Sequence, residues 1–361
     1  MAQAVETGAG PEIAYTPGTG EARFMAAAHM QQPDHTPVWF MRQAGRCLAD
    51  YRALREKYDI LTLAKTPELS AQVTVMPVDQ LGVDAAVMFA DIMIPLQGMG
   101  IDLEILPGGP VIHNPIRSLA DVQKLRVIDP TDVQPVLDAI RLVRRELSGK
   151  QAVIGFSGAP FTLASYLIEG GPSRTFEKAK TMMFDEPETW AALMDILADV
   201  VIVYLKAQIE AGAQAVQLFD SWVGALNPQD YTRSVQPQTT RIFDAIRETG
   251  TKTIHFGTGD ASLLELRRDA GGDLLSVDWR VNLDEAWERI GHDRGIQGNL
   301  DGTMMHSSWE RIRQGADIVI AQAANRPGHI FNLGHGVQPD TDPGKLRQLV
   351  EYVHQQTERA K

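Results

Sequence analysis

The stretch PETWAALMDILADVVIVYLKAQIEAG (187–212), followed by AVQLFD (215–220), reads as a helix that leads directly into a strand. Apolar residues recur every three or four positions along 187–212, which predicts an amphipathic helix, and Gly212 supplies its stop. The short apolar run at 215–220 predicts a buried strand. Helices that alternate with buried strands are typical of α/β proteins with a parallel sheet.

Similar strand-length runs occur on both sides of this unit. The predicted strands are TPVWFM (36–41), AAVMF (85–89), AVIGFS (152–157), AVQLFD (215–220), TIHFG (253–257), LLSVDW (274–279), GIQGNL (295–300) and HIFNLG (329–334). Eight such units in one chain favour a closed (β/α)₈ barrel over an open doubly wound sheet. No GxGxxG or GxxxxGK[ST] motif follows any of these strands, so the sequence gives no support to nucleotide binding.

The ends and insertions of the chain complete the predicted organisation. Residues 1–21 are rich in Gly, Pro, Thr and Ala and lack the pattern of a secretory signal, so we expect a disordered lead before a single barrel domain at 22–361. The segment IDLEILPGGPVI (101–112) predicts a hairpin inserted after the second strand, with its turn at Pro107, Gly108 and Gly109.

Composition excludes several classes of protein. The net charge of −12 argues against a nucleic-acid binder, because phosphate affinity depends on Lys and Arg. No apolar run reaches the ~20 residues that a membrane span requires. With Cys47 as the single cysteine, neither an intramolecular disulfide nor a thiolate-rich zinc site can form, so we expect a reducing, cytoplasmic location.

Polar residues follow several of the predicted strands, where the catalytic groups of barrel enzymes lie. They are Arg42 and Arg46 after the first strand, Asp91 after the second, Tyr166 beyond the third, Ser221 after the fourth and His335 after the eighth. Because the carboxyl ends of parallel strands meet at one rim, we expect these side chains to converge.

Each of these residues also has an ordinary structural interpretation. Arg42 and Arg46 can aim two guanidinium groups at one acidic ligand or form surface salt bridges. Asp91 can accept hydrogen bonds from a ligand, or cap the helix that follows. Tyr166 can pack in the core, Ser221 can cap a helix, and the glycines around His335 suit either a ligand or a tight turn.

Four long motifs resemble the uroporphyrinogen decarboxylase family: PVWFMRQAGR, GFSGAPFTLASYLIEGG, QGNLD and GHIFNLGHGV. The likeness extends from about residue 22 to residue 356. It implies a decorated barrel that acts as a homodimer with facing clefts. The implied reaction removes CO₂ from the four acetates of uroporphyrinogen III to give coproporphyrinogen III, without a metal or an organic cofactor.

The resemblance also implies roles for individual residues. Asp91 is similar to the family carboxylate that accepts pyrrole N–H groups, and Arg42 to the arginine proposed to bind the reacting carboxylate and to take part in proton transfer. An arginine that only positions the carboxylate or an intervening water is equally consistent with the sequence. The further substrate-binding positions implied are Gln43, Ala44, Gly45, Arg46, Phe156, Tyr166, Ser221 and His335. Tyr166 is also counted among the catalytic residues. Cys47, Ala49 and Gly302 depart from the family pattern, which leaves local loop geometry open.

Two other functions compete with this one. A corrinoid-linked methyltransferase shares the barrel, but it needs a zinc-activated thiol, for which a chain with one cysteine and no HxC string lacks ligands. A tetrapyrrole carrier that has lost turnover would have little need for Asp91 together with the paired arginines.

Overall fold

The computed structural model of this chain describes residues 15–359. Residues 1–14 of the predicted lead lie outside the described part of the chain. Helix α1 (Gly20–Ala28) begins close to the boundary predicted between lead and barrel, and the Thr19 hydroxyl accepts the Ala22 N–H at 3.2 Å to cap it.

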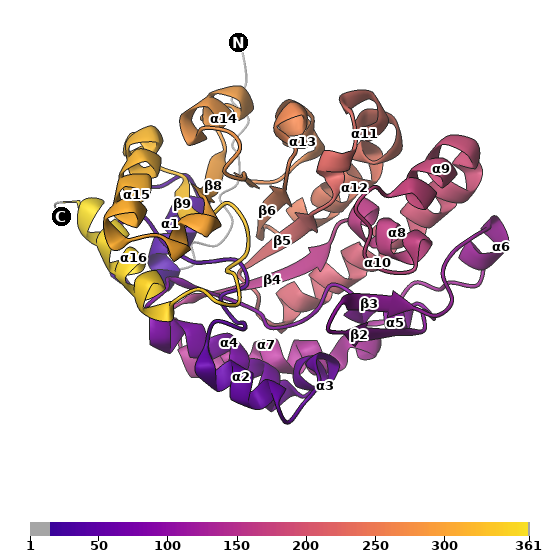
Figure 1. The fold of residues 1–361 in the computed structure, drawn as a ribbon, viewed down its shortest axis with the longest axis horizontal. Helices are drawn as coiled ribbons and strands as arrows, with labels where there is room; N and C mark the ends of the chain where they lie inside the picture. The colour runs from indigo at the N-terminus through magenta and orange to yellow at the C-terminus, as the bar shows by residue number, and fades with distance from the viewer. Residues whose placement is uncertain (1–14, 360–361) are drawn as a thin grey trace, which may run out of the picture.

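Parallel strands form one curled sheet at the centre of the molecule (Figure 1). In sheet order they are β1 (Ala85–Val87), β4 (Ala152–Gly158), β5 (Ala215–Asp220), β6 (Lys252–Gly257), β7 (Leu274–Ser276), β8 (Gly295–Leu300) and β9 (His329–Leu333). Neighbours in this order follow one another along the chain once the hairpin β2–β3 is set aside. All residues of β4 and β8 are buried, as expected for strands that are covered on both faces.

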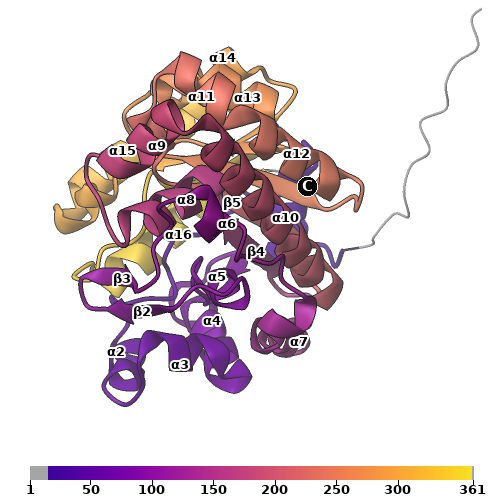
Figure 2. The ribbon, with the colours of Figure 1, turned by 90° about the vertical axis from the view of Figure 1, so that its right-hand side faces the viewer.

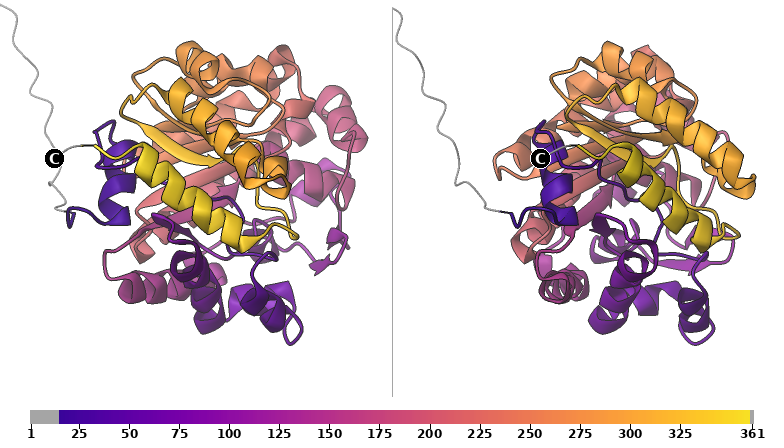
Figure 3. Two further views of the ribbon diagram at one scale, coloured as in Figure 1. Left: turned by 60° about the vertical axis from the view of Figure 1, so that its left-hand side comes forward. Right: turned by 90° about the vertical axis from the view of Figure 1, so that its left-hand side faces the viewer.

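Helices surround the outer face of the sheet (Figure 1). After α1, they are α2 (Ala49–Arg55), α3 (Ile60–Lys65), α4 (Pro67–Leu81), α5 (Ile94–Gly98), α6 (Leu119–Val122), α7 (Gln134–Leu147), α8 (Pro160–Glu169), α9 (Glu177–Asp185), α10 (Pro187–Ala211), α11 (Pro228–Ser234), α12 (Gln236–Arg247), α13 (Leu264–Ala270), α14 (Leu283–Ile290), α15 (Trp309–Ala323) and α16 (Pro343–Gln356). Helix α10 ends as predicted, with Gly212 at a φ of 118°. Helices α15 and α16 lie side by side next to the last strands (Figure 3).

The prediction of a regular first strand at 36–41 is wrong. This segment makes a single parallel bridge, between Val38 and Phe331 of β9. The Phe331 N–H donates to the Pro37 carbonyl at 2.9 Å, and on the other side the Asp84 N–H donates to the Val38 carbonyl at 2.8 Å. The segment therefore contacts both edges of the curled sheet without forming a full ladder with either.

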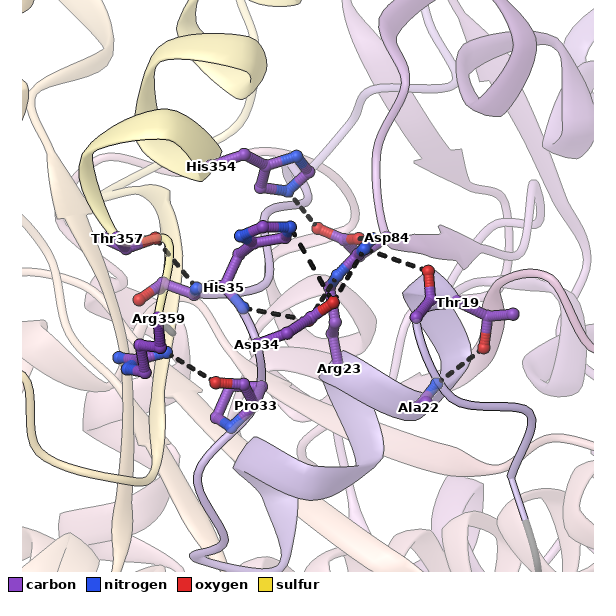
Figure 4. A network of polar contacts seen from close by, with 12 residues as sticks. Thr19, Ala22, Arg23, Pro33, Asp34, His35, Asp84, His354, Thr357 and Arg359 are labelled. Atoms are coloured by element: carbon purple, nitrogen blue, oxygen red, sulfur yellow. Dashed lines mark hydrogen bonds and ion pairs between the residues drawn. The ribbon is translucent and has the colours of Figure 1, made fainter. Parts of the chain in front are cut away.

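Side chains replace the missing ladder bonds of this segment (Figure 4). The buried carboxylate of Asp84 accepts the Val38 N–H at 2.8 Å and contacts His354 Nε2 of α16 at 2.7 Å and Arg23 Nη1 of α1 at 3.2 Å. His354 in turn stacks on His35, with ring centroids 5.4 Å apart. Because one carboxylate holds backbone and side-chain donors from three segments, regular strand pairing is not needed there.

Polar side chains also meet inside the curled sheet. Trp39 Nε1 donates to Gln297 Oε1 at 2.9 Å, and Gln297 Nε2 donates to Gln217 Oε1 at 3.1 Å and to Ser276 Oγ at 3.0 Å. All four side chains are fully buried. These hydrogen bonds join side chains of the 36–41 segment, β5, β7 and β8 inside the curled sheet. They lie below the carboxyl ends of the strands.

A small antiparallel hairpin lies apart from the main sheet, beside the end of α8 (Figure 2). Strand β2 (Leu103–Leu106) pairs with β3 (Gly109–Ile112), and Gly109, the first residue after the turn, adopts a φ of 121°. The Ile112 N–H donates to the Gly170 carbonyl at 3.0 Å, which ties the hairpin to the C-terminal end of α8.

Candidate functional site

The predicted site residues follow the strands at one rim of the curled sheet. Asp91 lies four residues after β1, Ser221 directly after β5 and His335 two residues after β9. Arg42 follows the 36–41 segment. Its positive charge is close enough to affect the pKa values of Asp91, Tyr166 and His335. These four side chains therefore share one electrostatic environment at the mouth of the sheet.

Asp91 occupies this mouth as a half-buried carboxylate. One oxygen, Oδ1, accepts the Met93 N–H at 2.9 Å, and the other makes no hydrogen bond with a described residue. Burial raises the pKa of Asp91, while the Met93 N–H and the Arg42 charge act in the opposite direction. One carboxylate oxygen is thus fixed by the backbone and the other is free to accept a donor from a ligand.

Arg42 is held above the rim by an unusual backbone. Its φ of 60° is in the left-handed region, which non-glycine residues seldom adopt and which is found preferentially at functional sites. A methyl group added to Gly336 would lie 2.5 Å from Arg42 Cδ, so the glycine leaves room for the arginine stem. Arg42 and Arg46 are both exposed, and neither forms an ion pair with an acidic side chain in residues 15–359. The surface salt bridges considered from the sequence are therefore not found.

Gln43 lies in the wall of the sheet rather than in its mouth. Its side chain is fully buried; Oε1 accepts the Phe40 N–H at 2.9 Å and Nε2 donates to the Ala85 carbonyl at 2.9 Å. Both ends of the amide are therefore occupied, and a substrate could meet only the backbone here. Ala44 and Gly45 are half-buried in the turn that carries Arg46.

Aromatic rings form one side of the mouth. Phe156 of β4 contacts Phe219 of β5 edge-to-face at 5.4 Å, and Phe219 contacts Phe256 of β6 at 5.2 Å. Tyr166 of α8 lies 6.1 Å from the ring of Trp222. Burial raises the pKa of Tyr166, so its hydroxyl stays protonated at neutral pH and can donate a hydrogen bond. Such rings offer an apolar surface to a ligand.

The remaining rim residues are polar. The Ser221 carbonyl accepts the Thr258 hydroxyl at 2.8 Å, and the Ser221 side chain makes no bond to a described residue. His335 is exposed, and its pKa is lowered by desolvation and by the nearby charges of Arg42 and Arg280. A neutral imidazole at this position can either donate or accept a hydrogen bond.

The sequence interpretation missed a buried ionic cluster behind this rim. Arg267 of α13 is fully buried and pairs with Asp260 at 2.6 Å. Asp220, at the end of β5, accepts the Thr162 hydroxyl at 3.3 Å, and burial raises its pKa to about 7. In the sequence, Asp220 is compatible with an acceptor behind the site, but nothing signals that an arginine 47 residues later would lie next to it.

Two observations limit other chemistries at this rim. Cys47 is buried, and desolvation raises its pKa to about 11, so its thiol is not ionised at neutral pH. Within residues 15–359, no cluster of three or more His, Cys, Asp or Glu side chains has the arrangement of a metal site.

In the same part of the chain, no helix combines the length and apolarity needed to cross a bilayer.

Comparison with known proteins matches this chain to one family. The family model described as "Uroporphyrinogen decarboxylase (URO-D)" matches residues 19–356. Relatives named uroporphyrinogen decarboxylase include one from Carboxydothermus hydrogenoformans, 52% identical over 92% of this chain and 95% of the relative. Another, from Streptomyces avermitilis, is 51% identical over 97% of this chain and 98% of the relative.

A comparison of structures agrees on the fold. A methyltransferase from Methanosarcina mazei superposes with a TM-score of 0.76 at 19% identity, covering 93% of this chain and 98% of that one. At this level of identity the likeness concerns the fold alone. The family match spans nearly all of the described residues and includes every rim residue above, so this chain belongs to the uroporphyrinogen decarboxylase family.

Proposed function

We propose that this protein is a uroporphyrinogen decarboxylase, which converts the four acetate side chains of uroporphyrinogen III to methyl groups and yields coproporphyrinogen III in haem biosynthesis. The observation that carries the proposal is the carboxylate of Asp91, held by one backbone N–H at the mouth of the sheet with its second oxygen free and Arg42 nearby. Close relatives over most of the chain carry this name.

Asp91 suits the electronic demand of the reaction. Loss of CO₂ from an acetate leaves an electron pair that needs an acceptor, and protonation of the adjoining pyrrole carbon makes the ring a cation that can take it. The free Asp91 oxygen would accept pyrrole N–H groups and lie near this positive charge. A fixed anion in a partly desolvated site stabilises such a cation more strongly than water does.

Arg42 would bind the carboxylate that is lost. The reaction consumes one proton per acetate: CO₂ leaves, the new methylene is protonated to a methyl group, and the proton added to the ring is removed. A guanidinium group holds its proton very tightly, which suits carboxylate binding better than proton donation. The protonated hydroxyl of Tyr166 is a second donor at this side of the mouth.

The other rim residues would bind the remaining substrate carboxylates. Arg46, Ser221 and His335 each present a side chain free of bonds to the described acidic residues. Phe156 would face the apolar ring, whereas Gln43, Ala44 and Gly45 would contribute through the backbone of the turn. No cofactor is needed in this proposal, because the protonated pyrrole itself serves as the electron acceptor.

We further infer the larger organisation that the family resemblance implies. The 36–41 segment would occupy the eighth strand position of a closed barrel. Residues 22–361 would form one domain, and residues 101–112 would be a hairpin inserted in that domain. The bonds of this segment to both sheet edges support closure. A homodimer with facing clefts, a cytoplasmic location and no nucleic-acid partner complete the proposal; the un-ionised Cys47 thiol and the charge of −12 are compatible with the last two.

The test is anaerobic incubation of the purified protein with enzymatically generated uroporphyrinogen III, followed by oxidation and chromatography of the porphyrins. The proposal predicts successive seven-, six-, five- and four-carboxyl products. Recovery of bound but unchanged eight-carboxyl porphyrin would indicate a carrier instead. Absence of both binding and turnover would overturn the assignment.

A further inference from the structure

The proposed substrate contacts cover only part of the rim. They come from the 36–41 segment, β1, β4, β5 and β9, whereas β6, β7 and β8 contribute none. A porphyrinogen with eight carboxylates around its ring presents negative charge in every direction over the mouth. The four residues that follow each of β5, β6, β7 and β8 are 221–224, 258–261, 277–280 and 301–304, and they include one Arg, no Lys and no His. That Arg is Arg280, the fourth residue after β7.

Arg280 is held in one orientation by its neighbours. Its guanidinium carbon lies 4.1 Å from the centre of the Trp279 ring, and Nη1 donates to Asp278 Oδ2 at 2.5 Å. The side chain is nevertheless 51% exposed, and its other N–H groups make no bond to a described residue. Stacking and one hydrogen bond thus orient a guanidinium group whose second edge faces solvent.

The pair with Asp278 does not by itself account for Arg280. Asp278 is 3% exposed, but its oxygens already accept two backbone donors, the Gly259 N–H at 2.6 Å and the Arg280 N–H at 2.8 Å. The carboxylate is therefore satisfied without the guanidinium group, and a half-exposed ion pair adds little to stability. The arrangement is better explained as Asp278 and Trp279 positioning Arg280.

Arg280 lies with the other substrate-binding groups rather than apart from them. Trp279 contacts the His335 ring edge-to-face at 6.4 Å, so Arg280 and His335 lie against the same indole. The backbone of Trp279 approaches the loop after β9 so closely that a methyl group on Gly334 would lie 2.6 Å from its nitrogen. Both the Arg280 and the Arg42 charges act on His335. In the strand order, β7 is the fourth strand after β1. In the closed eight-membered barrel proposed above, the fourth position from β1 faces it, so Arg280 would lie across the mouth from Asp91.

We propose that Arg280 is a substrate-binding residue that holds a carboxylate of the porphyrinogen on the side of the cleft opposite Asp91. This inference rests on the proposed function and adds to it a specificity determinant at the end of β7. The outward edge of the guanidinium group matches the two oxygens of a carboxylate. Because that carboxylate is remote from the reacting acetate, its binding should affect substrate affinity more than the chemical step.

The experiment compares Arg280→Met and Arg280→Lys with the wild-type protein and with Arg247→Met. Arg247 is a matched control: it is the last residue of α12, is 68% exposed and pairs with Asp244 at 2.6 Å, in a helix that ends before β6 begins and hence at the opposite end of the strands. Steady-state kcat and KM for uroporphyrinogen III are measured anaerobically, together with the Tm of each variant.

For Arg280→Met the inference predicts a KM raised by about tenfold or more, as for the loss of one charge-assisted contact, with kcat within about threefold of wild type. Arg280→Lys should fall between the two, because it keeps the charge without the fork. Arg247→Met should match wild type, and every Tm should remain close to the wild-type value.

Two results would overturn the inference: a KM for Arg280→Met that equals that of Arg247→Met, or a fall in kcat with KM unchanged. Failure of the proposed function is a separate outcome, since it would appear as a lack of turnover in the wild-type protein and in Arg247→Met as well. In that case the inference about Arg280 fails with it.

Discussion

Individual side chains at the rim differ from ordinary surface residues in how their hydrogen-bonding capacity is used. Asp91 keeps one oxygen free, Arg42 has a left-handed backbone and no acidic partner among the described residues, and the buried Asp220 has one oxygen without a donor. Gln43 shows the opposite, because its amide is fully used by the backbone. Such differences lead to separate predictions for neighbouring residues.

The raised pKa of Asp91 predicts the acid side of the pH profile. Burial disfavours the charged carboxylate, so it becomes protonated at a higher pH than an ordinary Asp as the pH falls. Since the proposed mechanism requires the Asp91 anion, kcat/KM should decline on the acid side above the usual range of Asp titration. Measurement of kcat/KM from pH 4.5 to 8 checks this. An acid limb that stays flat down to pH 4.5 would contradict it.

Asp220 predicts a pH dependence of stability rather than of activity. Its pKa is raised to about 7 in the folded protein, so between about pH 4 and pH 7 the native state holds a proton that the unfolded chain has lost. Stability therefore falls as the pH rises through this window, by up to about 1.4 kcal/mol per pH unit from this group. Asp220→Asn removes this contribution.

Urea unfolding of wild type and Asp220→Asn at pH 5, 6 and 7 tests that prediction. The midpoint of the variant should gain on that of wild type as the pH rises. Midpoints that change in parallel would show that Asp220 does not take up a proton on folding.

Substitution of Gly336 tests whether activity depends on the exact position of the Arg42 side chain. A methyl group there would lie 2.5 Å from Arg42 Cδ and 3.2 Å from its Cβ, so Gly336→Ala must displace the arginine stem. We expect kcat/KM to fall roughly 10- to 100-fold, because small displacements of catalytic groups are costly. Gly302→Ala is the control, since its nearest neighbour would lie at 3.8 Å. Equal activities of the two variants would argue against positioning of Arg42 by Gly336.

At the scale of elements, the least regular one joins the two edges of the sheet. The 36–41 segment has one bridge to β9, and on the β1 side it depends on Asp84 and on Gln43. The sequence TPVWFM has the apolar, β-branched and aromatic composition of a strand, so a strand was predicted there. The composition correctly indicates that the segment is buried. It does not show that the carboxylate of Asp84 and the amide of Gln43 take the place of the hydrogen bonds of a regular strand ladder.

Substitution of Asp84 tests how much this junction contributes to the free energy of unfolding. Asp84→Ala removes the acceptor for Val38 N–H, Arg23 and His354 together and leaves buried donors unpaired. We expect a loss of about 3–5 kcal/mol in the free energy of unfolding. Asp84→Asn should lose less, because its Oδ can still accept the Val38 N–H. Chemical denaturation compares the variants, and a loss below about 1 kcal/mol for Asp84→Ala would show that the junction has other support.

For the whole molecule, the short-range sequence pattern predicted where the helices and strands lie. Contacts between residues far apart in the sequence determine which side chains meet, and the local pattern does not specify these. The strands at 215–220 and 295–300 have the bounds predicted from their apolar runs, and Gly212 ends α10 as expected. The convergence of Arg42, Asp91, Tyr166 and His335 followed from the rule that strand ends share a rim. The Arg267–Asp260 pair and the Trp279–Arg280 stack could not be predicted, because no local pattern specifies which charges or rings face each other.

The central claim is that the negative charge of Asp91 drives decarboxylation of the porphyrinogen. Asp91→Asn tests it most directly, because the amide oxygen can keep the bond to Met93 N–H while the charge is lost. Asp342→Asn is the control, since Asp342 accepts Gly344 N–H at 2.8 Å in the same i, i+2 geometry at the start of α16.

Both variants are incubated anaerobically with uroporphyrinogen III, and the porphyrins are separated after oxidation. The account predicts that Asp91→Asn forms decarboxylated products about 10²- to 10³-fold more slowly than Asp342→Asn, as for the loss of one preorganised electrostatic group. Product formation by Asp91→Asn within about threefold of the control would contradict it, because a neutral side chain would then serve as well as the carboxylate.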